Sequence, residues 1–379
     1  MQIKNRVYIT ATTSSSCAGD NNQGLFENIL FHSTGIVQDS NYFFDAKPAI
    51  GKLSSNNSFY TELILQCNKT LEYSHLQNFK NTLLLVGSSV GGMNVTEDIY
   101  MRTEDYVDIN PNKHHIQAIS NTLTAEFDFY DSLSFSTACT SSANAIGYAY
   151  EVLSKGLYEN VLVVGADSLS RTTVGGFLTL GVLSSEPCKP FDAERDGMNV
   201  SEAVACLLIE NEMREGCVEL CGVGYSSDAY HMTHPHPDGE GAKKAMLNAL
   251  EVANLKPHDI DYINAHGTGT QANDSAEGNA IQTLFSNKAE QPKQPYVCST
   301  KSITGHTLGA AGALEAIISC MVLKEQTIPS NTFLKKAENT NINLSLENHS
   351  GELNYVMSNS FAFGGNNCSL IFGKVDYVS

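Results

Sequence analysis

Four side chains in this 379-residue sequence could together carry out covalent and proton-transfer chemistry. Cys139 offers a thiol, which attacks electrophiles as its thiolate, and His266 and His306 offer imidazoles, which exchange protons near neutral pH. Lys301 lies five residues before His306 and adds a positive charge. Since a free cysteine or a loop histidine is more often structural, it is the combination that indicates nucleophilic catalysis.

The nucleophile of this set follows an extended run and precedes a helix rich in small residues, in the segment SLSFSTACTSSANAIGYAYEVL. A cysteine at the start of a helix meets the positive end of the helix dipole and unpaired backbone N–H groups. Both features stabilise a negative sulfur. The sequence therefore predicts that Cys139 is an activated nucleophile whose surroundings favour the thiolate.

The two histidines are also expected in turns that follow strands. His266 lies in NAHGTGT, directly after the apolar run DYIN, so its ring could point into a pocket lined by Thr268 and Thr270. His306 lies in KSITGHTLGAAGALE, where Lys301 and His306 precede another helix of small residues. These turns would supply proton-transfer groups or hydrogen-bond donors, and a charge that tunes them.

The elements that must position these residues indicate an α/β protein. Short β-branched runs that end in glycine turns are typical of buried strands, and they occur at 7–10, 82–87 and 161–168. Segments with helical periodicity lie between them, at 141–155, 241–255 and 310–325. A weak break near 215–217 divides the chain into an N-terminal half, 1–215, with the cysteine, and a C-terminal half, 216–379, with the histidines.

Composition excludes several classes of function. With 23 basic and 41 acidic residues the formal charge is −18, which argues against nucleic-acid binding, because such binding depends on Lys and Arg neutralising phosphates. The ten cysteines form no CxxC pair and have no histidine at zinc-finger spacing, so we expect free thiols and no metal site. The glycine-rich loops GSSVGG and FAFGGNN lack the order of a phosphate-binding loop, so we expect no nucleotide.

The ends of the chain and its apolar runs bear on localisation. The first residues, MQIKNRVYIT, alternate like a strand and lack the apolar run of a signal peptide. The longest apolar stretches are too short to span a bilayer. We therefore expect a soluble protein of the cytoplasm with no membrane association.

The sequence resembles the elongating β-ketoacyl-acyl-carrier-protein synthases of the thiolase-like superfamily. From about residue 82 onward it carries six motifs in the order of that family, namely TACTSSANAIG, CKPFDAERDG, SSDAYHMT, NAHGTGT, KSITGHTLGAAGALE and NSFAFGGNN. The resemblance implies an α/β fold of two similar halves stacked as a duplicated five-layered αβαβα core, with the active site between the halves and with dimerisation.

The resemblance also implies a role for each candidate residue. Cys139 would accept the acyl group as a thioester, and His266 and His306 would act on the thioester carbonyl of the extender. Lys301 would order the second histidine, together with Glu315 and with Glu277 nearby. The remaining matches are Phe363, the gating phenylalanine whose N–H forms an oxyanion hole with that of Cys139; Thr268 and Thr270, which bind the pantetheine arm; His231, at the same entry; and Asp274, which is structural.

The implied reaction needs no bound cofactor, because the substrates are carried on the phosphopantetheine of an acyl carrier protein. The partners would be that carrier protein and a second chain, either a copy of this one or a related ketosynthase-like chain. Such carrier proteins are strongly acidic, and so is this chain. Docking is therefore expected to depend on a small local cluster of Lys and Arg residues.

Departures from the family pattern concern substrate and partner. The chain reads SEAVA at 201–205 where the family has a Gly-Glu-Gly-Ala run, and ATTSSS at 11–16 replaces an N-terminal glycine-rich turn. These changes point to a specialised type II system, such as aryl-polyene or polyketide synthesis, rather than general fatty-acid synthesis. We expect the first departure to alter the surface that faces a second subunit.

Two alternatives remain beside the elongating synthase. A non-catalytic partner subunit, like a chain-length factor, usually lacks the nucleophilic cysteine, which argues against that assignment. A degradative thiolase would have a second catalytic cysteine near the C-terminal glycine motif. Cys368 lies just beyond that motif, and we interpret it as a structural thiol.

Overall fold

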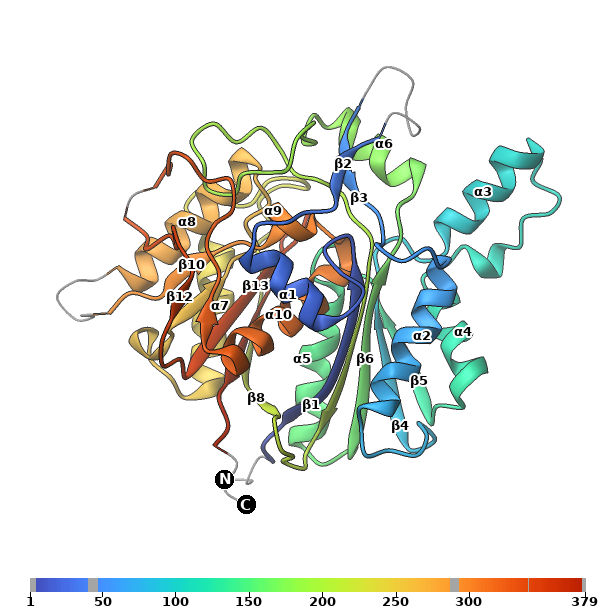
Figure 1. Cartoon of the computed structure of the whole chain (residues 1–379), viewed down its shortest axis with the longest axis horizontal. Coiled ribbons are helices and arrows are strands. Elements are labelled where there is room, and N and C mark those ends of the chain that lie inside the picture. Colours follow the sequence, from blue (N-terminus) through green and yellow to red (C-terminus); the bar gives the residue numbers. More distant parts are fainter. Residues whose placement is uncertain (1–4, 40–46, 287–292, 340, 377–379) are drawn as a thin grey trace.

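The computed structural model of the chain describes residues 5–39, 47–286, 293–339 and 341–376 (Figure 1). Its main element is one ten-stranded mixed sheet that consists of two five-stranded halves. The N-terminal half is ordered β1-β7-β6-β4-β5 and is formed by β1 (Tyr8–Ser16), β4 (Thr82–Gly87), β5 (Asp131–Phe135), β6 (Asn160–Asp167) and β7 (Ala203–Glu210).

The C-terminal half repeats this arrangement. It is ordered β8-β14-β13-β9-β10 and is formed by β8 (Val218–Ser227), β9 (Tyr262–Asn264), β10 (Tyr296–Cys298), β13 (Tyr355–Phe361) and β14 (Asn366–Gly373). In both halves the strands lie in the spatial order first, fifth, fourth, second, third. The halves join where β1 pairs with β8 at Tyr8–Glu219 and Ile9–Val218. The predicted duplicated α/β fold is therefore confirmed.

Two helices of small residues lie between the halves of the sheet. Helix α5 (Ser141–Ser154) contacts β4 and β6 of one half and β8 and β14 of the other, and α10 (Ala311–Glu325) contacts β6, β7 and β13. They pack closely, because a Cβ added at Gly312 would lie 2.5 Å from the backbone nitrogen of Ala143. This close packing explains why both segments are rich in Ala and Gly.

Other helices cover the outer faces and complete five layers. Helix α2 (Phe59–Glu72) packs on β1 and β7, while α7 (Glu240–Ala253) packs on β8 and β14 beside α8 (Gln271–Phe285). The smaller elements include α1 (Asn22–Leu30), α4 (Gln117–Phe127), α6 (Arg171–Thr179), α9 (Lys301–Thr304), three 3₁₀ turns (Pro111–Lys113, Pro257–Asp259, Leu308–Ala310) and two strand pairs, β2 (Ile36–Gln38) with β3 (Ala49–Gly51) and β11 (Thr327–Ile328) with β12 (His349–Ser350).

Helix α3 (Met93–Thr103) differs from these helices, because it projects away from the body of the molecule at the edge next to α2 and α4 (Figure 1). Thr96 is its one buried residue. Within the described parts of the chain, none of the helices has the length and apolar character that a bilayer span requires.

The two departures from the family pattern both lie in the interior, so the expectation that the first alters a subunit surface was wrong. The ATTSSS segment is part of β1, where it pairs with β7 and is largely buried. The side chains of Ser201, Ala203 and Val204 are fully buried, and a Cβ added at Gly305 would lie 2.6 Å from Ser201 Cβ. This departure therefore changes interior packing and not a surface that faces a second subunit.

Candidate active site

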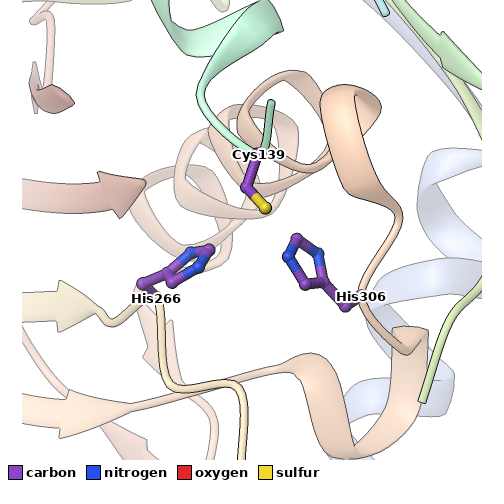
Figure 2. Close-up of side chains that lie close together, drawn as sticks. All are labelled: Cys139, His266 and His306. Carbon is purple, nitrogen blue, oxygen red and sulfur yellow. The ribbon is translucent and has the colours of Figure 1, made fainter. Parts of the chain in front are cut away.

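Cys139, His266 and His306 converge between the two halves of the sheet (Figure 2). One potential ligand atom from each of the three, the cysteine sulfur and a ring nitrogen of each histidine, lies within 4.8 Å of the others. The two imidazole rings are 5.2 Å apart between centroids and nearly perpendicular, at 86°. The structure thus brings Cys139 together with two histidines that lie more than a hundred positions after it in the sequence.

Cys139 lies in a sharp turn between β5 and α5. The preceding residue, Ala138, has a left-handed φ of 53°, a conformation that costs free energy in a residue with a side chain. Hydroxyl groups hold this turn from two sides, because Ser89 Oγ donates to the carbonyl of Ala138 at 2.8 Å and Ser141 Oγ donates to it at 2.6 Å. The turn directs the sulfur toward the histidines.

Protein atoms enclose the sulfur, although Cys139 as a residue is only partly buried. Burial raises the pKa of the Cys139 thiol to about 11, while the charge of Lys301 and the backbone N–H groups of Phe363 and of Cys139 itself lower the pKa. Burial outweighs these effects, so the resting form is the thiol and not the predicted thiolate. The two N–H groups predicted to form the oxyanion hole do face the sulfur.

The backbone of His266 is fixed by the carboxylate of Glu277. Glu277 accepts hydrogen bonds from the N–H groups of His266 at 2.9 Å and Gly267 at 2.8 Å. Burial raises the pKa of Glu277 to about 7, although these backbone donors oppose the rise. Glu277 is therefore a positioning residue that acts on the loop and does not reach the reacting atoms.

Lys301 orders the first histidine rather than the second. Its Nζ donates to the carbonyl oxygen of His266 at 2.6 Å, lies 3.4 Å from His266 Nδ1 and forms an ion pair with Glu315. The prediction that Lys301 orders His306 was wrong in this respect, since the direct contacts are to His266. The association with Glu315 is as the sequence analysis expected.

Both imidazoles are held in the same tautomer. Lys301 has only protons to offer, so His266 Nδ1 is an acceptor, and His306 Nδ1 accepts from the backbone N–H of Leu308 at 3.2 Å. Burial lowers the pKa of each ring well below 6.5, and the charge of Lys301 lowers both further. Each ring is therefore neutral near pH 7 and carries its proton on Nε2.

A cavity of about 280 Å³ leads to these three side chains. The hydroxyl groups of Thr268 and Thr270, 2.9 Å apart, lie on one wall. Phe363 lies at the tip of the turn between β13 and β14, with its ring 6.0 Å from that of Phe177, and the exposed His231 lies at the rim. All the predicted substrate-binding residues therefore line one cavity.

The sequence analysis did not identify Arg195, which organises the threonine wall. Its buried guanidinium donates to the carbonyls of Thr270 at 3.2 Å and Gln271 at 3.0 Å, and it pairs with Asp274 and Glu338. Asp274 in turn accepts from two backbone N–H groups, those of Phe191 and Gly269, which fits its predicted structural role. The signal for Arg195 lay in the motif CKPFDAERDG, which contains this arginine. A buried arginine requires anionic partners.

Asp167 was also missed by the sequence analysis. It is fully buried at the end of β6 and accepts from the backbone N–H groups of Ser89, Val90 and Gly309 at 2.9, 2.9 and 2.6 Å. Burial raises the pKa of Asp167 to about 6. Asp167 therefore links the GSSVGG loop to the loop before α10. These two loops flank the turn that holds Cys139, so Asp167 supports that turn. Only the fold brings these loops together.

Two family models match this chain. The model described as "Beta-ketoacyl synthase, N-terminal domain" matches residues 57–214, and the model described as "Beta-ketoacyl synthase, C-terminal domain" matches residues 217–335. Among curated proteins, the 3-oxoacyl-[acyl-carrier-protein] synthase 2 of Coxiella burnetii is 36% identical over 314 residues, which are 76% of this chain and 74% of the relative. The Staphylococcus aureus relatives of the same name are 35% identical over 61% of their own length.

Solved structures give a similar result over nearly the whole chain. The ketosynthase ApeO in complex with its chain length factor ApeC, from Xenorhabdus doucetiae, matches with a TM-score of 0.87 and 32% identity over 98% of both chains. A β-ketoacyl synthase from Burkholderia phymatum also matches with a TM-score of 0.87, at 27% identity, over 98% of this chain and 100% of the other.

Proposed function

The chain belongs to the β-ketoacyl synthase family of acyltransferases, and we propose that it is an elongating β-ketoacyl-acyl-carrier-protein synthase. In the first half-reaction Cys139 accepts an acyl group from a carrier protein as a thioester. In the second, a malonyl thioester on a carrier protein loses carbon dioxide, and the resulting enolate attacks the acyl group on Cys139.

The observation that carries this proposal is that the cysteine sulfur and one ring nitrogen of each histidine lie within 4.8 Å of one another. Because Lys301 and Leu308 contact the two Nδ1 atoms, the Nε2–H groups are the donors available at this point. Decarboxylation of a malonyl thioester places negative charge on the thioester oxygen. Two neutral imidazole N–H donors aimed at that oxygen stabilise charge that develops in the transition state. We propose that the N–H groups of Cys139 and Phe363, which face the sulfur, do the same for the tetrahedral intermediates of acyl transfer.

We propose that no metal ion or other cofactor takes part. The spacing of Cys139, His266 and His306 would suit a metal ion, but a metal ligand needs a free lone pair on the coordinating nitrogen. The contacts of the two Nδ1 atoms place the proton on Nε2 in both rings. Lys301 adds a positive charge beside the site, which disfavours a cation.

The site disfavours both alternatives. A non-catalytic subunit does not need a cysteine in a strained turn opposite two oriented histidines. A thiolase would need a second reactive cysteine in the cavity, but Cys368 is fully buried within β14 and is absent from the described lining of the cavity. Burial raises the pKa of the Cys368 thiol, as expected of an unreactive structural cysteine.

The test of the activity is intact-mass analysis after incubation with a set of acyl-carrier-protein thioesters. One acyl group should add to the wild-type chain and none to Cys139→Ala. Carbon dioxide release from malonyl carrier protein should need both histidines. Acylation of another cysteine in Cys139→Ala would contradict the proposal.

We also propose that a second ketosynthase-like chain pairs with this one, either as a copy or as a different subunit. Strand β5 is an edge of the ten-stranded sheet, and an unpaired edge can accept another strand. Exposed apolar side chains lie on or next to β5 and on α3 or just after it, namely Tyr100, Met101, Tyr106, Val107, Tyr130 and Leu133. Helix α3 projects from the body of the molecule at this side (Figure 1). The Xenorhabdus structure contains a ketosynthase in complex with its chain length factor.

Light scattering of the purified chain distinguishes the two forms of this proposal. A stable homodimer would support self-pairing. A monomer that forms a one-to-one complex with a related chain would support a heterodimer.

We also propose that the protein acts in the cytoplasm, in a type II pathway that makes a fatty acid, an aryl polyene or a polyketide. A panel of primers of different length would separate these pathways.

A further inference from the structure

We infer that Glu97 is a positioning residue for acyl transfer, because it fixes the helix that forms one wall of the cavity. This inference rests on the proposed function and adds a residue that acts through another element. Glu97 belongs to α3, the helix that projects from the body of the molecule (Figure 1). The wall consists of α6 and the turn after it, whose lining residues are Phe177, Leu180, Gly181 and Val182.

Helix α6 has little intrinsic stability. Its nine residues, RTTVGGFLT, include two interior glycines and a run of three β-branched residues, and both kinds of residue have low helix propensity. A helix of this length is marginal in water, so it needs tertiary packing. Val174 is its one buried residue, and Phe177 is only partly buried against the same apolar cluster. The position of α6 therefore depends strongly on the contacts at its ends.

Glu97 supplies the contacts at the N-terminus of α6. The first N–H groups of a helix have no partner within the helix. The Glu97 carboxylate accepts from the N–H of Arg171 at 2.6 Å and from that of Thr172 at 2.9 Å, while Ser170 Oγ accepts from the N–H of Thr173 at 3.0 Å. The three leading N–H groups of α6 are thus satisfied, and the negative charge also interacts favourably with the helix dipole.

A second contact between α3 and α6 lies closer to the reacting groups. Ser170 Oγ is 3.2 Å from the sulfur of Met93, the first residue of α3. Met93 and Phe177 pack against one apolar cluster, which also contains Leu308. The N–H of Leu308 donates to His306 Nδ1. A displacement of α6 would therefore change both the wall of the cavity and the packing behind His306.

The experiment compares Glu97→Ala with the matched control Asp98→Ala. Asp98 is the next residue of α3, is exposed, and points about 100° away from Glu97 around the helix. The substrate is the acyl-carrier-protein thioester that acylates the wild type fastest. Glu97→Ala should lower kcat/KM for acylation of Cys139 about tenfold, and Asp98→Ala should leave it unchanged. Glu97→Gln keeps one carbonyl acceptor and should recover part of the loss.

Amide hydrogen exchange separates positioning from a general loss of stability. In Glu97→Ala, faster exchange should be confined to α3, α6 and the turn after α6, and iodoacetamide should alkylate Cys139 at the wild-type rate. Unchanged acylation in Glu97→Ala would overturn the inference, as would an equal loss in Asp98→Ala. Faster exchange throughout the molecule would also overturn it, because Glu97 would then support the whole fold. Absence of acylation of the wild type by every thioester would overturn the proposed function as well.

Discussion

The two halves of the molecule share one strand order but use equivalent turns differently. After the third strand of each half the chain turns into a central helix, at Cys139 between β5 and α5 and at Lys301 and His306 between β10 and α10. In the proposed reaction the first turn presents the nucleophile and the second presents a proton donor. The duplication therefore brings two strand-turn-helix units together, and the residue at each turn determines its chemistry.

The loops after the second strand of each half differ more strongly. The GSSVGG loop after β4 directs its backbone N–H groups to the carboxylate of Asp167 and supports the cysteine turn. The NAHGTGT loop after β9 is held by Glu277 and Lys301 and carries His266, one of the proposed reacting groups. In the proposed function one loop of the pair is structural and the other is catalytic.

The largest effect should come from removing the nucleophile of the N-terminal half. Cys139→Ala should lower acylation at least about 10⁴-fold, because the remaining groups cannot form the covalent intermediate. Intact-mass analysis measures the acylation, and circular dichroism should show an unchanged fold. A variant that kept appreciable transfer would show that the division of roles between the halves is wrong.

Changes in the C-terminal half should separate the two half-reactions. His266→Ala or His306→Ala should lower the decarboxylation of malonyl carrier protein about 10²- to 10³-fold, the usual effect of losing one such donor. Self-acylation should fall much less, because the backbone oxyanion hole and the N-terminus of α5 remain. Carbon dioxide release and acyl-enzyme formation are measured in parallel, and equal losses would mean that the histidines activate the thiol.

The buried ion pair should show how the histidine loop is ordered. Lys301→Met leaves Glu315 as an unpaired buried carboxylate and should lower the free energy of unfolding by about 3–5 kcal/mol. The double variant Lys301→Met with Glu315→Leu should recover most of this stability without recovering decarboxylation. Denaturant unfolding measures the first effect. Full activity in the double variant would contradict a role for Lys301 in setting the tautomer of His266.

The smallest predicted effect concerns pH. Since burial raises the pKa of Cys139 to about 11, the thiolate fraction should rise about tenfold per pH unit throughout the neutral and mildly alkaline range. Alkylation of Cys139 by iodoacetamide, followed by mass spectrometry, should therefore increase without a plateau up to about pH 9. A plateau near pH 7 would show that the start of α5 and Lys301 outweigh burial after all.

Local sequence patterns were sufficient to predict many of the helices and strands of this protein. The helical periodicity of 141–155 and 310–325 matches α5 and α10 within one residue at each end, and TLLLVG is β4 as predicted. The strand predicted at 7–10 was too short, because the serines and threonines of 11–16 are not the apolar residues typical of a buried strand. They belong to β1 since pairing with β7 and packing against α2 bury them.

The sequence by itself determined the candidate reacting residues Cys139, His266 and His306 and the strand-turn-helix setting of the cysteine, because nucleophiles and proton donors have few possible residue types and local turns have recognisable composition. The tertiary structure alone decided the contact of Lys301 with His266, the shared tautomer of both rings and the protonated resting thiol. These depend on distances between distant segments and on exclusion of water, which no local pattern encodes.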